Sequence, residues 1–223
     1  MRSSRRWNPQ ARQPALPRGR RASGWAWLAA LACLGGVPAW AQGAGPTIGH
    51  VLALRGEAWL DGQPLRPGDR LQAGATVRTG QPGRLRLRLE DGSVLVLSDA
   101  TELRLEHWAT SGGGARQASL WLPLGLIGQT VRPQAGGSWQ VRTPSAVTAV
   151  RGTEFLVEVD ASLNTAVQVN AGAVSVDPAG GAGPTRLLDQ AAQGTDCRAD
   201  TGCSEVKTWP RARVQALRDR LEF

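Results

Sequence analysis

The chain has 223 residues and a formal net charge of +8. Seven of its 26 basic residues lie in residues 1–41, a segment without acidic residues, so the remaining 19 stand against 18 acidic residues. This near balance does not indicate a nucleic-acid-binding surface, and we expect no nucleic-acid partner. The roughly 180 residues that follow are enough for one domain of ordinary size.

Residues 1–41 have the three parts of a secretory signal peptide. Seven arginines occupy residues 2–21, an apolar stretch runs from Trp25 to Val37, and Pro38-Ala39-Trp40-Ala41 supplies small residues for a signal peptidase. We expect cleavage after Ala41 and a periplasmic or secreted protein. The alternative is an uncleaved anchor, and the only membrane contact would then be through this segment. The apolar stretch is short for that role, because a spanning helix needs about 20 apolar residues.

Beyond residue 41, apolar and polar residues alternate repeatedly, as in strands with one buried face. Residues 48–60 indicate two short strands around Arg55-Gly56, and glycine-punctuated segments follow up to residue 80. Residues 84–89 alternate arginine with leucine, and Asp91-Gly92 is a strong hairpin signal before a returning strand. Further strands are expected at 94–97, 103–105, 119–122, 139–142, 153–159, 165–169 and 173–176.

Strands at this frequency, with glycine-rich loops between them, predict an all-β fold. We expect an antiparallel-rich sandwich or roll of many short strands. The pattern changes at Trp209-Pro210, after which Val214, Leu217 and Leu221 share one helical face. The predicted organisation is a signal peptide over 1–41, a β domain over 42–208 and a short amphipathic helix over 209–223 that packs on the domain. A helix that binds a membrane or a partner is the alternative.

Cys197 and Cys203 are the cysteines that follow the leader. An even number of cysteines in an oxidising compartment predicts a disulfide. Closing this small loop would stabilise the fold by roughly 2 kcal/mol. The carboxylates nearby match no calcium-loop spacing, so we expect no metal site there.

One segment is more specific than these patterns: Thr143-Pro144-Ser145-Ala146, which leads to Val150-Arg151-Gly152-Thr153 and Phe155. It resembles the central motif of the FecR domain family, T-P-x-A-x-x-x-V-R-G-T-x-F. Six further matches follow the order of that family. They are G-x-A at 56–58, L-x-x-G-D at 65–69, V-x-T-G at 77–80, L-x-L-x-D-G-S at 87–93, L-x-L-x-x-G at 120–125 and V-x-V-x-x-G-x-V at 167–174. The resemblance covers residues 48–177 and implies an all-β extracytoplasmic domain.

The founding member of that family is an inner-membrane regulator that senses a loaded iron-siderophore receptor and controls a sigma factor. Here only 24 residues, rich in proline and arginine, precede the apolar stretch. The resemblance therefore implies a stand-alone exported FecR domain rather than the full sigma-factor regulator, and iron signalling is not carried over.

Arg151, Gly152 and Thr153 are candidate binding residues, but a structural interpretation competes. Gly152 would supply backbone freedom at a turn or bulge. Arg151 would pair with a carboxylate such as Glu154 inside the fold. Phe155 would then face the core.

Five tryptophans remain beyond the leader, and core packing is the default for most of them. Trp59 and Trp108 adjoin polar turns and are the candidates for exposed binding residues, because an indole ring can stack on a sugar or anchor a partner.

No residues indicate catalysis. His50 and His107 are the only histidines, and the sequence has no nucleophile elbow, no phosphate-cradling loop and no H-E-x-x-H motif. We therefore expect no enzyme, no metal and no cofactor. We expect an exported, non-catalytic module that binds or scaffolds another cell-envelope component in envelope signalling. The first choice for that component is a protein. The alternative is a structural protein that binds glycan or peptidoglycan.

Overall fold

The computed structural model describes residues 46–110, 114–181 and 183–223, so the predicted signal peptide lies outside the described residues. Within them the chain forms sixteen strands and one helix, which confirms the expected all-β fold with a short C-terminal helix. The elements are β1 (Thr47–Leu60), β2 (Gln63–Pro64), β3 (Arg70–Gln72), β4 (Thr76–Leu89), β5 (Val94–Leu97), β6 (Glu102–Thr110), β7 (Arg116–Thr130), β8 (Ser138–Arg142), β9 (Ala146–Val150), β10 (Glu154–Val159), β11 (Thr165–Ala171), β12 (Val174–Pro178), β13 (Arg186–Leu188), β14 (Gln193–Arg198), β15 (Gly202–Cys203), β16 (Lys207–Thr208) and α1 (Arg211–Asp219).

Several strands are longer than the sequence indicates, among them β1, β4 and β7. β1 is continuous over residues that were expected to form two strands, and β4 extends the arginine–leucine alternation back to Thr76. The two strands pair with each other along most of their length, and their register shifts between Gly56 and Ala58. The glycine thus marks a bulge within a strand rather than its end.

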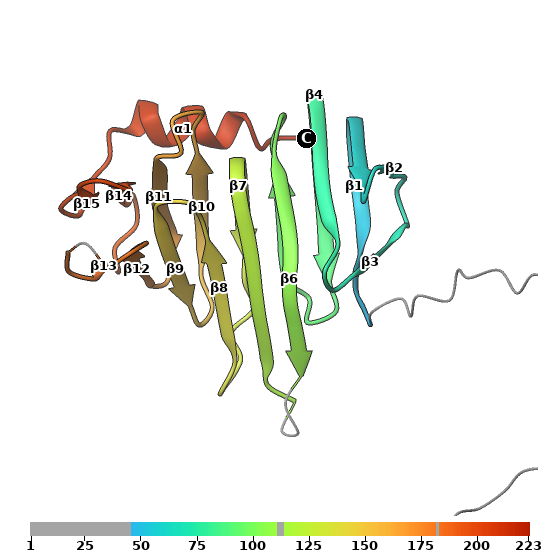
Figure 1. Cartoon of the computed structure of the whole chain (residues 1–223), viewed down its shortest axis with the longest axis horizontal. Coiled ribbons are helices and arrows are strands. Elements are labelled where there is room, and N and C mark those ends of the chain that lie inside the picture. Colours follow the sequence, from blue (N-terminus) through green and yellow to red (C-terminus); the bar gives the residue numbers. More distant parts are fainter. Residues whose placement is uncertain (1–45, 111–113, 182) are drawn as a thin grey trace, which may run out of the picture. The chain divides into compact units, whose positions relative to one another are not determined.

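The long strands carry the chain between two layers. Residues 116–124 of β7 pair with β6 and β8, whereas residues 125–130 pair with β5 and β10. β4 likewise pairs with β6 near its start and with β5 near its end. We call the layers sheet I (β13-β12-β9-β8-β7-β6-β4-β1-β2) and sheet II (β15-β14-β11-β10-β7-β5-β4-β1-β3). In Figure 1, β6 and β8 of sheet I lie in front of β10 and β11 of sheet II.

β7 changes layers at Gly125, whose backbone φ is +102°. A Cβ at this position would lie 2.5 Å from the Cα atom of Thr101, so only glycine fits the corner. The Thr101 hydroxyl accepts a hydrogen bond from the Leu126 N–H at 3.1 Å, and the Thr79 hydroxyl accepts one from the Thr101 N–H at 2.9 Å. Two threonines therefore join the backbones that meet where the layers exchange strands.

The core lies between the sheets and contains a buried ion pair at one end. Arg116 donates to Asp91, and their side chains are only 2% and 4% exposed. The guanidinium also lies 5.0 Å from the ring centre of the buried Trp139. Asp91 accepts the Ser93 N–H at 2.9 Å, as expected of an aspartate in a turn. The hairpin residue therefore has a second role, a partner in the core, that the sequence did not indicate.

Helix α1 packs on the outer face of sheet II and runs across its strands (Figure 1). The contact is formed by apolar residues of sheet II and of the C-terminal segment: Leu126, Leu156, Ala166, Ala192, Trp209, Val214, Leu217 and Leu221. Burial of that stripe explains why so short a helix is stable, since isolated helices of this length are marginal in water.

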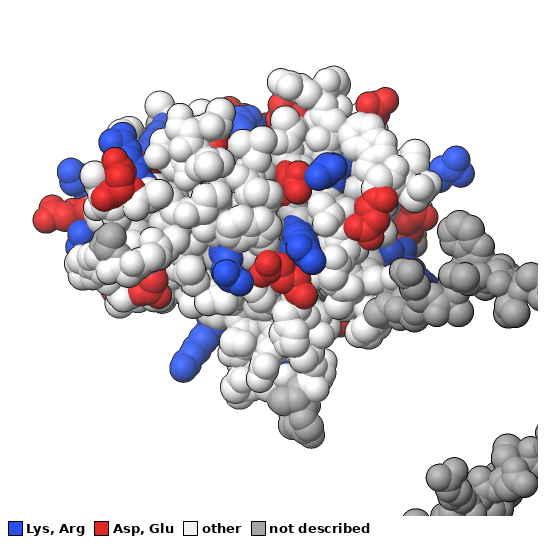
Figure 2. Space-filling view, in the orientation of Figure 1, with Lys and Arg blue, Asp and Glu red and all other residues white. Residues whose placement is uncertain are grey.

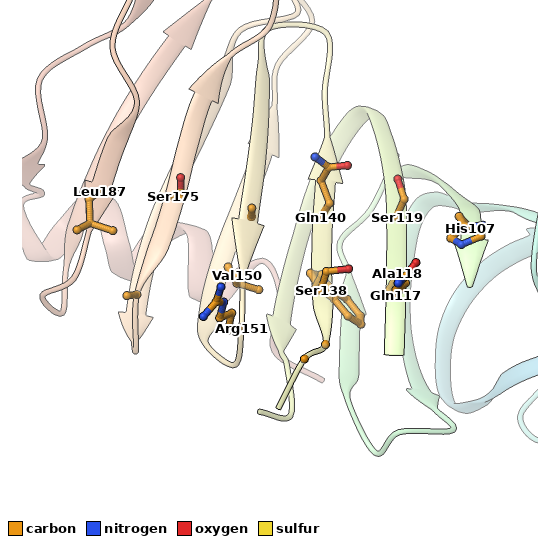
Figure 3. A pocket seen from close by; sticks show the side chains of 15 residues that line it. His107, Gln117, Ala118, Ser119, Ser138, Gln140, Val150, Arg151, Ser175 and Leu187 are labelled. Atoms are coloured by element: carbon orange, nitrogen blue, oxygen red, sulfur yellow. The ribbon is translucent and has the colours of Figure 1, made fainter. Parts of the chain in front are cut away.

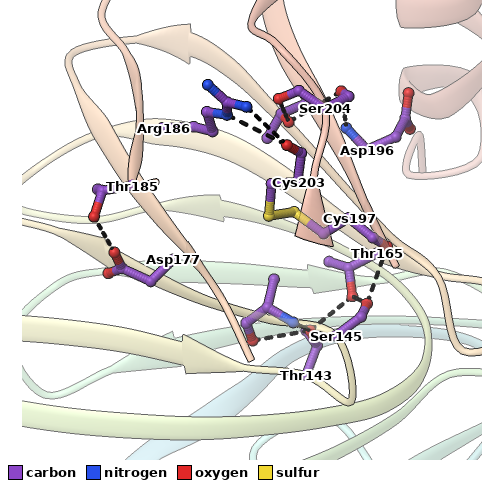
Figure 4. Close-up of a disulfide and its surroundings, with 12 residues drawn as sticks. Thr143, Ser145, Thr165, Asp177, Thr185, Arg186, Asp196, Cys197, Cys203 and Ser204 are labelled. Atoms are coloured by element: carbon purple, nitrogen blue, oxygen red, sulfur yellow. Dashed lines mark hydrogen bonds between the residues drawn. A yellow bond between two sulfur atoms is a disulfide. The ribbon is translucent and has the colours of Figure 1, made fainter. Parts of the chain in front are cut away.

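The expected disulfide between Cys197 and Cys203 is confirmed. It joins β14 to β15 at the edge of sheet II, and both cysteines are buried. Figure 4 shows the buried hydroxyls beside it. Ser145 donates to the Cys197 carbonyl at 3.1 Å, and its hydroxyl lies 2.7 Å from that of Thr165. The bridge thus fixes a strand whose backbone is also bonded to the interior of the fold.

Candidate functional site

A groove crosses the outer face of sheet I at right angles to its strands. One row of directly paired residues forms its floor, and Figure 3 shows this row on successive strands. The row runs His107 (β6), Ser119 (β7), Gln140 (β8), Ala149 (β9), Ser175 (β12) and Leu187 (β13). We call it the cross-strand groove. Its volume is about 880 Å³, and six strands spaced about 4.8 Å apart make it about 24 Å long.

Between His107 and Leu187 at its two ends, the floor of the groove is made of serine, alanine and glutamine. Serine, alanine and glutamine leave a trough, whereas the neighbouring row presents Trp121, Arg142 and Val147 as a higher rim. On the other side, Arg151 lines the groove with Ser138. Figure 2 shows this face mostly free of charged residues, with both signs mixed near its middle. The groove can therefore hydrogen-bond a ligand along its floor. Its rim carries both signs of charge, since Asp177 lies opposite Val147 and Glu106 accepts a hydrogen bond from Ser119 at 3.3 Å.

The Arg-Gly-Thr step is the place where the chain crosses from β9 in sheet I to β10 in sheet II. Gly152 has φ +150°, and a Cβ there would lie 2.7 Å from the Cα atom of Pro133. Thr153 donates its hydroxyl to the Ala173 carbonyl at 2.9 Å. These two candidate residues are thus fixed in the crossing, with Thr153 buried. Only the third, Arg151, reaches the surface.

Arg151 is exposed, so the interpretation that it pairs with Glu154 inside the fold is wrong. The Glu154 carboxylate instead accepts a hydrogen bond from Asn170 at 3.1 Å. The arginine that is buried in an ion pair is Arg116. Phe155 faces the core as expected. The physical reason is that the crossing turns the chain at Gly152, which places the residues on its two sides in different sheets.

A second hollow on the same outer face contains two tryptophans. Trp59 and Trp121 line it on opposite sides of Arg78, Glu102 and Arg104, with a volume of about 700 Å³. We call it the tryptophan groove. Arg78 donates to Glu102 at 2.9 Å, and this hydrogen bond together with the carboxylate charge raises the pKa of Arg78 above its ordinary value.

The other tryptophans pack against the core or beneath the helix. Trp108 is half-buried and meets Trp139 edge-on, with ring centres 6.4 Å apart. Trp209 is buried beneath α1. Of the two tryptophans expected to be exposed, only Trp59 therefore lies in a surface hollow, whereas Trp108 supports the core.

Nothing in the described residues assembles an obvious reactive centre. No group of three or more histidine, cysteine, aspartate or glutamate side chains is placed to hold a metal there. The described residues that line the cross-strand groove include His107 but no carboxylate and no cysteine.

Residues 75–175 match the family described as FecR protein. This chain contains a FecR domain. The match includes four of the six strands beneath the cross-strand groove and the first two residues of β12, whereas β13 lies outside it. The helix in the part of the chain that the structure describes is too short and too polar to span a membrane.

Two crystal structures of a proposed anti-sigma factor from Parabacteroides distasonis share the fold. Their TM-scores are 0.53 and 0.52, at 22% and 23% sequence identity. The likeness covers 63% of this chain in both cases, and 62% and 63% of the two solved chains. The chain thus spans less than two thirds of their length. No curated protein matches it.

Proposed function

We propose that this chain is an exported, non-catalytic FecR-domain module that regulates by binding another protein of the cell envelope through the cross-strand groove. The observation that carries the proposal is the floor row, in which six strands present directly paired side chains and the four central ones, Ser119, Gln140, Ala149 and Ser175, leave a trough. A trough about 24 Å long accommodates an extended polypeptide of about seven residues, since each residue of such a segment spans about 3.3 Å.

The charges at the rim indicate the chemistry of the partner. Arg104 extends the rim row, because it lies opposite Trp121. The ion pairs within the described residues include neither Arg104 nor Arg151, whereas Arg142 pairs with Glu106 at 3.5 Å. An extended segment with acidic residues would supply the missing partners. A protein partner also suits the FecR domain and its likeness to a proposed anti-sigma factor, because both descriptions belong to regulatory proteins.

Export is part of the proposal and is supported by the leader-like residues 1–41 and by the Cys197–Cys203 disulfide. Fractionation of cells that express the tagged protein tests it. We expect the protein, shortened by the leader, in the periplasmic or secreted fraction. Recovery of the uncleaved chain from the cytosol would contradict export.

Site-specific crosslinking in living cells tests the partner. A photoreactive amino acid that replaces Gln140 lies on the groove floor. The same amino acid in place of Arg211 on α1 is the matched control. We expect one protein to be captured reproducibly from position 140 and not from position 211. Ser175→Arg, which fills the floor, should abolish the capture. Equal capture from both positions, or none from position 140, would remove the groove as the binding surface.

Removal of single arginines tests the contribution of the rim separately from that of the floor. Arg151→Ala should weaken capture at position 140, whereas Arg198→Ala, which removes an exposed arginine elsewhere, should not. Equal effects of the two variants would mean that the rim arginine has no specific role.

The second candidate function is glycan binding, and the tryptophan groove favours it. Trp59 and Trp121 could stack on sugar rings while the charged side chains between them bond hydroxyl groups. Pelleting with purified cell-wall sacculi tests this function, with Trp59→Ala against Leu163→Ala as the control. Failure to pellet, together with unchanged tryptophan fluorescence on addition of glycans, would exclude it.

A further inference from the structure

The outer face of sheet II carries a group of cations beside the part covered by α1. Leu85, Leu87 and Leu89 of β4 point into the core, so the alternating arginines of this strand point outward. Neighbouring strands add more cations in the same rows. We call the set the arginine face: Arg55, Arg70, Arg84, Arg86 and Arg88, with His50.

The register places two of the arginines directly opposite each other. Arg55 pairs across the strands with Arg84. His50 lies between Arg70 on one side and Arg88 on the other. Directly opposed like charges destabilise a sheet, because their Cβ atoms are only about 5 Å apart. The fold thus contains a repulsion that an anion would relieve.

The chain does not neutralise this face itself. The ion pairs within the described residues involve Arg78, Arg116, Arg142, Arg213 and Arg220, and none involves the arginine face. On α1, by contrast, Arg213 pairs with Asp196 and Arg220 with Glu158. On this side of the molecule, arginines thus form ion pairs where the helix is packed, whereas those beside it form none within the described residues, although Glu154 and Glu222 line the same recess as Arg86.

Apolar groups accompany the cations. Leu52 of β1 is 40% exposed next to this row. Arg86 lies 4.6 Å from the ring centre of Phe223, and Arg84 donates to the Glu222 carbonyl. A recess of about 550 Å³ there is lined by Arg86, by apolar residues such as Val94 and Phe223, and by the carboxylates of Glu154 and Glu222. The Nε atom of Arg86 is buried without a hydrogen-bond partner. Cations mixed with exposed apolar side chains suit the boundary between lipid headgroups and acyl chains.

We propose that the arginine face docks on the phosphate groups of an anionic membrane surface. Guanidinium groups bind phosphate oxygens in a bidentate manner, and the face uses arginine throughout. Its arginines come from three neighbouring strands, β3, β1 and β4, and form a broad surface that suits a plane of lipid headgroups. The contact goes beyond the proposed function and beyond the expectation that only the leader touches a membrane. It would leave the cross-strand groove, on the opposite outer face, open to a partner.

Vesicle sedimentation of the purified exported protein tests the proposal. The vesicles contain phosphatidylglycerol and phosphatidylcholine, and pure phosphatidylcholine vesicles are the reference. The test variant is Arg70→Gln with Arg88→Gln, since both side chains are exposed. The control is Arg104→Gln with Arg151→Gln, which removes the same charge from the other face.

We expect binding to the anionic vesicles that falls with added salt. The Arg70/Arg88 double variant should bind about 30-fold more weakly, because each basic residue near an anionic surface contributes about fivefold. The control should change binding by less than about twofold. The melting temperature of the test variant should change little, because Arg70 and Arg88 are exposed and belong to none of the ion pairs within the described residues.

Three results would overturn the proposal. Equal losses in the two double variants would show that only total charge matters. Equal binding to neutral vesicles would assign the contact to the apolar residues. Vesicle binding unaffected by Arg70→Gln with Arg88→Gln, while inorganic tripolyphosphate protects the wild type from thermal unfolding, would show a site for soluble anions instead. None of these depends on capture at Gln140, so this proposal and the proposed function fail separately.

Discussion

The outer faces of the two sheets differ in what the chain does with them. On sheet II, Leu126 and Leu156 point outward and the chain covers them with Trp209, Val214 and Leu217. On sheet I, the outward positions in the centre are Ser119, Gln140, Ala149 and Ser175, and they form the floor of an open groove. Where the outward residues are apolar, the C-terminal part of the same chain covers them. Where they are small and polar, the surface stays open to water until a partner displaces it.

The largest expected effect lies where the two sheets are joined. Gly152→Val should cost more than about 3 kcal/mol, because the new side chain meets the Pro133 backbone and the residue must keep a positive φ. Urea unfolding followed by tryptophan fluorescence measures the loss. Gly180→Ala is the control, since Gly180 also has positive φ but no atom lies within 4 Å of its Cβ position, and about 1 kcal/mol is expected. Equal costs would show that the contact with Pro133 is unimportant.

The covered face should depend on its apolar contacts. Trp209→Ala should destabilise the fold by about 3 to 5 kcal/mol, because it empties a buried position between α1 and sheet II. Leu187→Ala on the open face removes a side chain that is 58% exposed and should change stability by less than about 0.5 kcal/mol. Thermal unfolding of both variants compares the faces directly, and similar shifts in melting temperature would contradict the distinction drawn between them.

The disulfide at the edge of sheet II should have an intermediate effect. Replacing both Cys197 and Cys203 with serine should cost about 2 kcal/mol, since the closed loop is short. Reduction of the wild-type protein should lower stability by a similar amount in the same denaturant experiment. A double variant as stable as the oxidised wild type would mean that the surrounding hydrogen bonds alone hold β14 and β15.

The smallest effect on stability is expected in the groove. Arg151→Ala should change the free energy of unfolding by less than about 0.5 kcal/mol, because the side chain is exposed and unpaired by carboxylates in the described residues. Capture of a partner at Gln140 should nevertheless weaken. A loss above about 1 kcal/mol would assign Arg151 a structural role instead.

The sequence was sufficient for features that depend on neighbouring residues. The alternation of arginine and leucine at 84–89 predicted which face of β4 is buried. The even number of cysteines beyond the leader, Cys197 and Cys203, predicted the disulfide. The apolar spacing of Val214, Leu217 and Leu221 predicted the helix and its packing. The Arg-Gly-Thr motif also indicated a constrained glycine, because only a close approach or a positive φ explains such a residue between two strands.

The tertiary structure alone decided which distant residues meet. β7 pairs with four other strands, one of them the parallel neighbour β8, and no local pattern specifies these partners. The register of those pairings brings Gln140 beside Ser175 through Ala149, creates the groove and sets Arg55 against Arg84. It also buries Arg116 with Asp91 while Arg151 stays exposed. A period of two fixes the face of each residue within its strand, but strand order and register are long-range choices made by the packing of the whole core.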